Sequence, residues 1–255
     1  MPATTKTSIF SLVISLLIVL NTSCKKDKAA VSSGRQKLKS YTEDITAQGI
    51  GHVIETFNIN YDGQDRITSI VSTTKPGHRL EYKYINNDKF TFEQIEDNKL
   101  LLHRDYFINA EVGKVDSLFQ YNISKDTTAF KYFYDKENRI LKQKEYLISY
   151  LLPPVWYNTI DYVYDTRGTL TKKAESFAET SYRYDEEYKN TTLLEPGYIP
   201  SQEKLPSHTY SIRFSLTTTT EHFYTYDGQG RLASEKAVAS DGSRQTITIR
   251  TYTYL

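Results

Sequence analysis

The side chains that could support chemistry are few and far apart in this 255-residue chain. No two of the five histidines stand two, three or four residues apart, which excludes HExxH and similar metal signatures. They are His52, His78, His103, His208 and His222. The sequence also has no Gly-x-Ser-x-Gly nucleophile elbow and no glycine-rich phosphate loop. We therefore expect no metal, no cofactor and no catalytic residue, and a protein that is not an enzyme.

Aspartates recur at regular places in the sequence. A pair of carboxylates could catalyse hydrolysis if the fold brought two of them together. Each of them, however, follows a tyrosine and opens a short polar run, where an Asp side chain accepts a backbone hydrogen bond and stabilises a turn. Calcium needs a denser set of oxygen ligands than Asp62 to Asp65 supplies. We interpret four of them as structural turn residues: Asp62, Asp135, Asp165 and Asp227.

The only cysteine is Cys24, and it follows an apolar stretch from Ile9 to Leu20. That stretch is too short to cross a bilayer and fits the apolar region of a signal peptide. A lone cysteine also excludes an intramolecular disulfide. We predict a lipoprotein signal peptide with lipidation (diacylglycerol and palmitate) at Cys24. The alternative is an ordinary signal peptide followed by a free thiol.

The aspartates belong to a recurring phrase: Tyr-Asp, a turn, a basic residue and an apolar residue. The clearest copy is Tyr226 to Leu232, and a decayed copy ends at Gly113 to Val115. Other copies start at Tyr61, Tyr134 and Tyr164, and degenerate ones start at Tyr84 and Tyr184. The starts lie roughly 20–30 residues apart where no copy is hidden, a spacing typical of repeat architectures.

The position four residues after the tyrosine holds residue types that tolerate a positive φ, as a hairpin with a bulged loop requires. These residues are Asp65, Asp88, Asn138, Gly168 and Gly230. Each phrase therefore predicts a β-hairpin, with Gly168 and Gly230 as structural turn residues beside the aspartates. Tyr188 breaks this rule, so we expect the copy at Tyr184 to lead into a long loop instead of a hairpin.

The flanking segments alternate between apolar and polar residues, as strands with one buried and one wet face do. The polar face carries Glu81, Lys83, Lys131, Asp161, Arg183 and Thr225. Such a face cannot meet lipid. We predict an all-β fold: an antiparallel meander of tandem hairpins, with about 14 strands, curled or closed into a barrel-like sheet with a Tyr-rich inner face. Buried tyrosine hydroxyls need partners, so a shortage of partners would indicate internal water or a ligand.

The hairpin phrase resembles the YD repeats of Rhs-type and teneurin shells. Together with the lipoprotein signal, the mature chain is similar to a family of uncharacterised Bacteroidota lipoproteins with a porin-like fold. The phrase covers most of residues 50–255, and the chain is too short to enclose a toxin as the long shells do. The resemblance implies a fold and an outer-membrane location, on the periplasmic side or at the cell surface. It implies no activity.

The chain divides into a signal peptide (1–23), a flexible tether (24–35) and a single β-domain of YD-type repeats (36–255). The tether is polar and unpatterned, and no Gly/Ser/Pro-rich seam divides the remainder. A formal net charge of +1 gives no electrostatic case for nucleic acid. The expected partners are the membrane, through the lipid at Cys24, and a small ligand; we expect a monomer.

Two segments interrupt the meander. Ile148 to Ile160 holds an unusually apolar run with the only tryptophan, and Glu186 to His208 is a long loop with three prolines. The first could be a binding lip, a membrane-dipping tip, or a loop that folds back and plugs one end of the barrel. The second could lie near the first. The ligand-binding residues that this predicts are Leu151, Leu152, Trp156, Tyr157 and Tyr198.

Three functions remain open. The first is a lipid-anchored, non-catalytic binding module of the cell envelope for an apolar or amphipathic ligand or a glycan. The second is a structural or protein-interaction scaffold of the outer membrane. The third is a hydrolase without a recognised motif, which would need carboxylates or histidines converging in a cleft.

Overall fold

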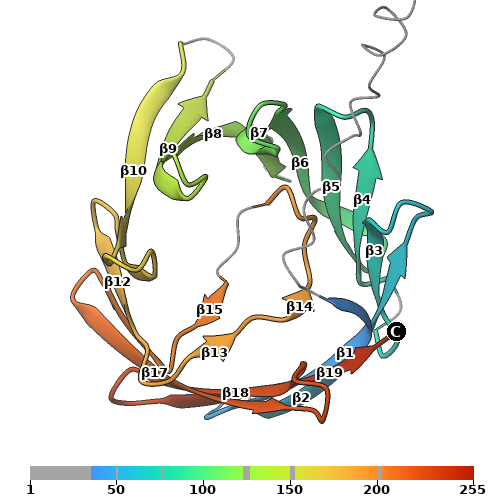
Figure 1. Cartoon of the computed structure of the whole chain (residues 1–255), viewed down its shortest axis with the longest axis vertical. Helices are drawn as coiled ribbons and strands as arrows, with labels where there is room; N and C mark the ends of the chain where they lie inside the picture. Colours follow the sequence, from blue (N-terminus) through green and yellow to red (C-terminus); the bar gives the residue numbers. More distant parts are fainter. Residues whose placement is uncertain (1–35, 50, 76, 123–126, 150–152, 200–202) are drawn as a thin grey trace, which may run out of the picture. The chain divides into compact units, whose positions relative to one another are not determined.

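Sixteen antiparallel strands close into a barrel in the computed structural model (Figure 1). The model describes residues 36–255 except 50, 76, 123–126, 150–152 and 200–202. The main sheet has seventeen strands, one of which, β14, only adds in parallel to the start of β1. The other sixteen form a ring that β1 closes by pairing with both β2 and β19.

The strands of the ring run in chain order, with one interruption between β12 and β16. Their bounds are β1 Gln36–Ala47, β2 Gly51–Tyr61, β3 Ile67–Ser72, β4 Arg79–Tyr84, β5 Lys89–Glu96, β6 Lys99–Asn109, β7 Lys114–Asn122, β8 Thr127–Tyr134, β9 Ile140–Ile148, β10 Val155–Tyr164, β11 Leu170–Ala174, β12 Ala178–Arg183, β16 His208–Arg213, β17 Leu216–Tyr226, β18 Leu232–Ser240 and β19 Gln245–Tyr254.

The predicted all-β meander is confirmed, with sixteen strands in the ring against the expected number of about 14. The difference comes from hairpins without the Tyr-Asp phrase. One example is the turn at Asp97 and Asn98, which joins β5 to β6 with both residues at positive φ. Because such turns lack the repeated tyrosine, the sequence pattern does not mark them.

Each complete phrase forms a turn in which the aspartate carboxylate accepts two backbone hydrogen bonds. In the clearest copy, Asp227 Oδ1 accepts from the N–H of Gln229 at 2.9 Å and from the N–H of Arg231 at 2.9 Å, while Oδ2 accepts from Arg231 Nε at 2.7 Å. The carboxylates of Asp62, Asp135 and Asp165 accept the equivalent backbone hydrogen bonds. These bonds replace ladder bonds where the chain reverses.

The backbone at the fourth position of these turns is left-handed. Gly168 has φ 80°, Gly230 has φ 74°, and Asp65 and Asn138 have φ 64° and 61°. The prediction for Asp88 was wrong, because its φ is not positive. Its turn has the same length, since Tyr84 pairs with Phe90 as Tyr61 pairs with Ile67, but here the N–H groups of Ile85 and Asn86 both donate to the carbonyl of Lys89.

In five of the six copies of the phrase, the tyrosine braces one hairpin against the part of the sheet before it. In the sixth copy, Tyr226 Oη donates instead to the Lys189 carbonyl, in the segment between β12 and β16, at 2.9 Å. Tyr84 Oη donates to the Ile67 carbonyl at 2.9 Å, and Tyr164 Oη donates to the Ile140 carbonyl at 2.9 Å. The same bond joins Tyr61 to Leu38, Tyr134 to Val115, Tyr184 to Leu170 and Tyr254 to Leu232. The accepting residue is the first apolar residue after a turn, or Leu38 near the start of β1. The repeat spacing therefore reflects a contact between neighbouring hairpins.

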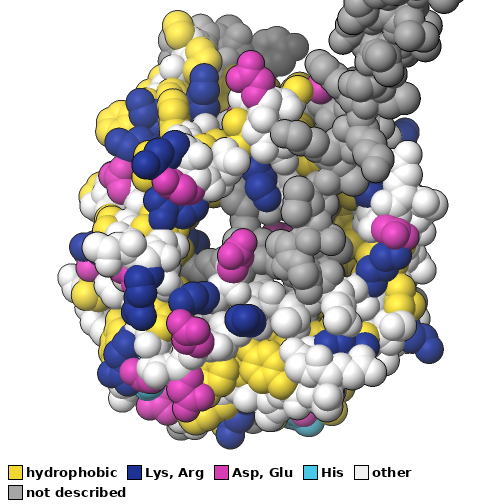
Figure 2. Space-filling model, in the orientation of Figure 1, with side chains coloured by type: hydrophobic (Ala, Val, Ile, Leu, Met, Phe, Trp, Pro, Cys, Tyr) yellow, Lys and Arg dark blue, Asp and Glu magenta, His cyan; other side chains and the backbone are white. Residues whose placement is uncertain are grey.

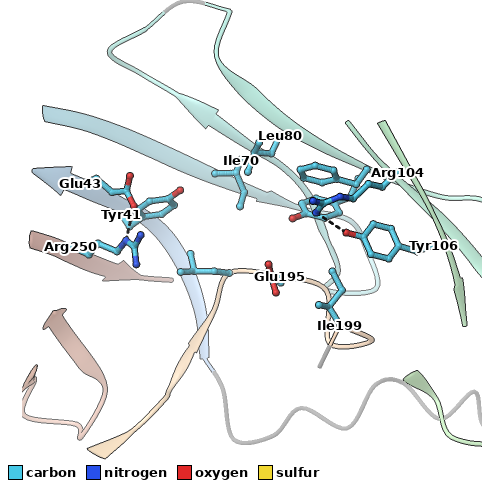
Figure 3. A pocket seen from close by; sticks show the side chains of 12 residues that line it. Tyr41, Glu43, Ile70, Leu80, Arg104, Tyr106, Glu195, Ile199 and Arg250 are labelled. Atoms are coloured by element: carbon cyan, nitrogen blue, oxygen red, sulfur yellow. Dashed lines mark hydrogen bonds and ion pairs between the residues drawn. The ribbon is translucent and has the colours of Figure 1, made fainter. Parts of the chain in front are cut away.

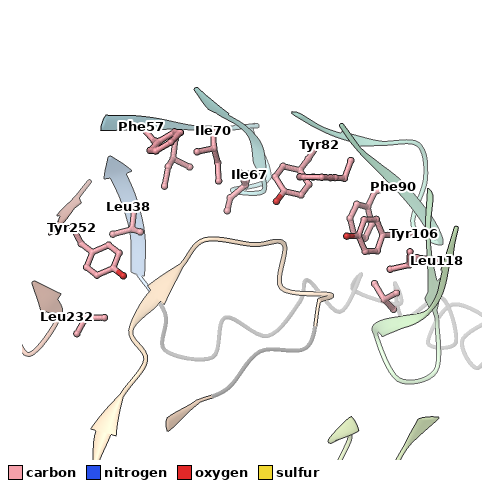
Figure 4. Close-up of a cluster of buried hydrophobic side chains, with 13 residues drawn as sticks. Leu38, Phe57, Ile67, Ile70, Tyr82, Phe90, Tyr106, Leu118, Leu232 and Tyr252 are labelled. Carbon is pink, nitrogen blue, oxygen red and sulfur yellow. The ribbon is translucent and has the colours of Figure 1, made fainter. Parts of the chain in front are cut away.

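The inner face of the sheet carries the apolar core (Figure 4). Phe90 is fully buried and stacks on Tyr106 with ring centroids 4.5 Å apart. The core lines one part of the wall, and its buried members are Leu38, Phe57, Ile59, Ile67, Ile70, Tyr82, Phe90, Phe92, Tyr106, Val115, Leu118, Leu232 and Tyr252. On the outer face, Lys83, Lys131, Asp161, Arg183 and Thr225 are exposed. The Tyr-rich face points inward, as the alternation predicts.

The segment between β12 and β16 folds into the barrel instead of forming a hairpin (Figure 1). It contains the short strands β13 (Tyr188–Lys189), β14 (Thr192–Leu193) and β15 (Lys204–Leu205). Its far end reaches β7, where the N–H of Val115 donates to the Tyr198 carbonyl at 3.0 Å and Lys114 Nζ donates to the Gly197 carbonyl at 3.1 Å. We call residues 184–199 and 203–207 the inward segment.

Candidate functional site

A cavity of about 230 Å³ lies between the inward segment and the inner face of the barrel (Figure 3). One wall of the cavity consists of residues on strands β1, β3 to β6 and β19. The inward segment forms the facing wall. Its lining is aromatic, aliphatic and charged: Tyr41, Glu43, Ile70, Leu80, Tyr82, Phe92, Arg104, Tyr106, Leu194, Glu195, Ile199 and Arg250. Figure 2 shows the barrel hollowed near its middle, with basic and acidic side chains around the hollow.

One side of the cavity holds a network of paired charges. Arg250 Nε donates to Glu43 Oε1 at 2.6 Å, and Arg250 Nη1 lies 3.8 Å from Glu235 Oε2. Burial by itself would raise the pKa of the Glu235 carboxyl, but the hydrogen bond with His222 and the charge of Arg250 hold that pKa below its ordinary value. Glu235 is therefore ionised at neutral pH, and the charge of Arg250 is shared between two carboxylates.

The opposite side presents Arg104, whose orienting hydrogen bonds go to neutral groups. Arg104 Nε donates to Gln120 Oε1 at 2.8 Å, and Nη1 donates to Tyr106 Oη at 3.3 Å. Its guanidinium also lies 5.6 Å from the centroid of the Phe92 ring. No ion pair joins Arg104 to a carboxylate among the described residues. Neutral hydrogen-bond partners therefore hold its positive charge in place at the cavity wall.

Two tyrosine hydroxyls at this cavity lack protein partners. Within residues 36–255 as described, neither Tyr41 Oη nor Tyr82 Oη has a hydrogen-bond partner in the protein, and Tyr82 is only 7% exposed. Burial raises the pKa of both hydroxyls, so both keep their protons at neutral pH. A buried hydroxyl without a partner is costly, and water or a ligand in the cavity would satisfy it.

Glu195, on the inward segment, lies between the two arginines of the cavity (Figure 3). It is exposed toward the cavity and raises the pKa values of Tyr82 and Tyr106 in addition to the effect of their burial. The cavity thus combines aromatic and aliphatic walls, an anion-attracting guanidinium, a carboxylate and hydroxyl groups. This arrangement can bind a small amphipathic molecule. The described residues that line it do not bring a nucleophile, a base and an orienting group together.

Of the five predicted ligand-binding residues, the structure describes three, and these three lie in two different places. Leu151 and Leu152 lie outside the described residues, as does Cys24. Trp156 and Tyr157 are 55% and 43% exposed on β10, and Trp156 Nε1 donates to Thr159 Oγ1 at 3.0 Å. Tyr198 lies in the inward segment, with its ring centroid 6.1 Å from that of Phe90. It packs against the core near the cavity and has no contact with Trp156.

The sequence analysis did not predict the charged residues Arg104 and Arg250 on the inner face of the barrel. Arg104 stands two residues from Tyr106, and Arg250 stands two residues from Tyr252, so both arginines are in phase with the inward tyrosines. An arginine in that phase points into the barrel. This phase was the signal that could have identified them. The sequence does not predict that both arginines line the same cavity, because β6 and β19 are far apart in the chain.

The recurring aspartates do not converge, because each accepts hydrogen bonds inside its own turn. The described residues contain no group of three or more His, Cys, Asp and Glu side chains arranged to hold a metal ion. They also include no helix with the length and hydropathy of a membrane span.

Comparison with known proteins gives a fold without a family. No family model and no curated protein matches the sequence. The structure is similar to a porin-like protein from Bacteroides uniformis ATCC 8492, with a TM-score of 0.62 and 13% identity over 87% of this chain and 100% of that chain. A porin-like protein from Bacteroides vulgatus ATCC 8482 is 14% identical over 86% of this chain and 99% of that chain, with a TM-score of 0.36. The likeness to the first protein shows that this chain has a porin-like barrel fold.

Proposed function

We propose that this protein is a non-catalytic binding module that holds a small amphipathic ligand with an acidic group inside the barrel. The observation that carries the proposal is the buried Tyr82 hydroxyl, which has no partner among the described residues and lies at a cavity that also presents the guanidinium of Arg104. An acidic group on the ligand would meet Arg104 in a charge-assisted hydrogen bond. The ligand's apolar part would pack against Leu80, Phe92 and Ile199.

The size of the cavity limits the ligand. Its volume of about 230 Å³ is below the range of roughly 300–1,000 Å³ that accommodates drug-sized molecules. We expect the part of the ligand inside this cavity to be a single ring or a short chain with one acidic group. A sugar ring fits the same description, because it offers an apolar face to aromatic side chains and hydroxyls to the tyrosines.

We further propose that the barrel is a lipoprotein of the cell envelope, anchored to the outer membrane by lipid at Cys24. The sequence pattern at residues 9–24 supports the anchor, and the likeness to a porin-like protein supports the outer membrane. The charged outer strand face supports a barrel that meets water instead of lipid tails. Protease treatment of intact and permeabilised cells would distinguish surface display from the periplasmic side, and globomycin sensitivity of processing would test the lipid anchor.

Native mass spectrometry of residues 25–255, purified gently, tests the binding proposal. A reproducible additional mass would identify the ligand class. In titrations with small aromatic acids and acidic monosaccharides, Arg104→Gln is expected to weaken binding by about tenfold, because a charge-assisted hydrogen bond is lost. Arg79→Gln is the matched control. Arg79 does not line the cavity, and its Nε pairs with Glu81 Oε1 at a distance of 2.6 Å. No binding by the wild type, or equal losses in both variants, would refute the proposal.

A specific surface favours a second function, that of a protein-interaction scaffold. Phe177 and Phe214 stack with ring centroids 5.7 Å apart and are 71% and 69% exposed. Leu216 beside them is 64% exposed. Exposed aromatics at this density are typical of interaction sites. Crosslinking in cells that depends on Phe177 and Phe214, with Arg104 dispensable, would favour the scaffold over the binding module.

A further inference from the structure

Lys173 on β11 is a cation held between two aromatic rings on the inner face of the barrel. Its Nζ lies 5.4 Å from the ring centroid of Tyr162 on β10 and 5.9 Å from that of Tyr182 on β12. Lys173 is paired in register with Tyr162, so the two side chains share a face of the sheet. No carboxylate forms an ion pair with Lys173 in the part of the chain that the structure describes.

The neighbouring Lys172 shows how different this setting is. It points to the other face of the sheet, where its Nζ pairs with Glu179 at 2.5 Å. Burial lowers the pKa of the Lys173 ammonium, against a smaller opposing effect of Glu175. A partly buried ammonium without a close carboxylate is stabilised by any anion that enters the barrel beside it.

A row of aromatic side chains connects Lys173 with Arg104 along the inner wall. Burial raises the pKa of the Tyr132 hydroxyl on β8, and the hydroxyls of Tyr106 and Tyr162 on either side raise it further. In the ring, β8 with Tyr132 stands between β6, which carries Arg104, and β11, which carries Lys173. Neither Tyr132 nor Tyr182 has a hydroxyl hydrogen bond to another described residue. The wall therefore offers ring faces and free hydroxyls between two cations.

Polar groups interrupt this row where β9 and β10 meet. Gln143 accepts from Tyr162 Oη at 3.2 Å and donates to Glu145 at 2.8 Å. Asn158 Nδ2 also donates to Glu145, at 3.1 Å. Amide and carboxylate groups at this place suit hydroxyl groups of a ligand and do not suit an alkyl chain.

We propose that the inner wall from Arg104 to Lys173 is an elongated binding track for an acidic oligosaccharide. This inference rests on the proposed binding function and extends it: the cavity at Arg104 would hold one acidic ring, and the rest of the chain would follow the inner wall toward Lys173. Tyr132 and Tyr162 would stack on sugar rings, and the amides of Gln143 and Asn158 would meet sugar hydroxyls. Arg104 and Lys173 would each bind a carboxylate or sulfate of the chain.

The spacing of the two cations indicates an oligomer. Arg104 is on β6 and Lys173 is on β11, which are five strand steps apart in the ring. At about 4.8 Å for each step, the backbone arc between these two strands measures about 24 Å. A chain of several sugars with spaced acidic groups can follow this arc from one cation to the other, whereas a single ring covers only a fraction of it.

Isothermal titration with tetragalacturonate, using maltotetraose and galacturonate as neutral and monomeric references, tests the track. The wild type is expected to bind tetragalacturonate more tightly than either reference. Lys173→Gln is expected to weaken tetragalacturonate binding by about tenfold. Lys172→Gln is the matched control, because it removes the same charge from the opposite face of the same strand, and it should leave binding unchanged. Lys173→Arg should retain binding, which would exclude a loss through misfolding.

Each outcome decides the proposal. Equal losses in the Lys172 and Lys173 variants would mean general charge attraction and would overturn the track. Equal affinity for maltotetraose and tetragalacturonate would overturn the requirement for an acidic chain. If tetragalacturonate does not bind while a small aromatic acid binds in an Arg104-dependent way, the track is wrong and the proposed function stands. If neither binds, both are wrong.

Discussion

The hydroxyl of Tyr254, the last tyrosine of the chain, at the end of β19, donates to the backbone carbonyl of Leu232, at the start of the preceding and neighbouring strand β18, at 2.8 Å. The guanidinium of Arg231 lies over the same ring, 4.5 Å from its centroid, and Asp227 orients that guanidinium. The same set of contacts joins Asp62, Arg66 and Tyr84. Aspartate, arginine and tyrosine of the repeated phrase thus act together as a brace between consecutive hairpins.

Removing one brace hydroxyl should weaken the barrel. Tyr254→Phe leaves the Leu232 carbonyl without its partner and is expected to cost about 1 kcal/mol. For a domain of this size the melting temperature should fall by about 2–4 °C. Tyr210→Phe is the control, because the Tyr210 hydroxyl makes no hydrogen bond to a described residue. Equal melting temperatures for the two variants would contradict the role of the brace.

The turn aspartates should make the barrel sensitive to acid. The backbone N–H of Arg231 is the main cause that lowers the pKa of the Asp227 carboxyl, and the N–H of Thr169 does the same for Asp165. A carboxyl with a lowered folded-state pKa stabilises the fold above its ordinary pKa of about 4 and loses that contribution as the pH falls further. In unfolding curves measured from pH 7 to pH 3, the midpoint urea concentration should decrease once the pH is below about 4. Asp227→Asn should make the urea midpoint less dependent on pH. The same pH dependence in this variant as in the wild type would contradict the proposed role of Asp227.

The left-handed turn position should tolerate glycine and penalise a side chain. Gly230 has φ 74° in open space, so Gly230→Ala is expected to cost about 1–2 kcal/mol through backbone strain alone. Gly228 in the same turn has no positive φ and also has open space around it. Gly228→Ala should therefore be close to neutral in a chemical denaturation series. Similar decreases in the free energy of unfolding for both variants would mean that the φ angle of Gly230 is not the cause.

The two faces of the sheet should differ sharply in their sensitivity to truncation. Phe90 is fully buried inside the barrel, and Phe90→Ala should cost about 3–5 kcal/mol. Phe133 points to the outer face and is 37% exposed, so Phe133→Ala should cost much less, since it leaves no closed cavity. Unfolding free energies from denaturant melts give the comparison. A larger loss at Phe133 would mean that the outer face is covered in solution.

The sequence by itself determined the hairpins, the turn chemistry and the inward direction of the tyrosines. These features depend on residues close together in the chain: an aspartate that caps the turn it opens, a glycine at a left-handed position, and strict alternation along one strand. The broken copy at Tyr184 marked the start of the inward segment for the same local reason, since Tyr188 occupies the position that glycine, asparagine or aspartate holds elsewhere.

Only the tertiary structure decided that the ring closes with sixteen strands and that the inward segment crosses the barrel to β7. Closure depends on the pairing of β1 with β19, which are separated by nearly the whole domain, and no local pattern encodes that contact. The cavity has the same origin. Arg104, Glu195 and Arg250 come from three distant parts of the chain, and they meet because a closed sheet brings its inner faces, and the segment folded inside it, to a common interior.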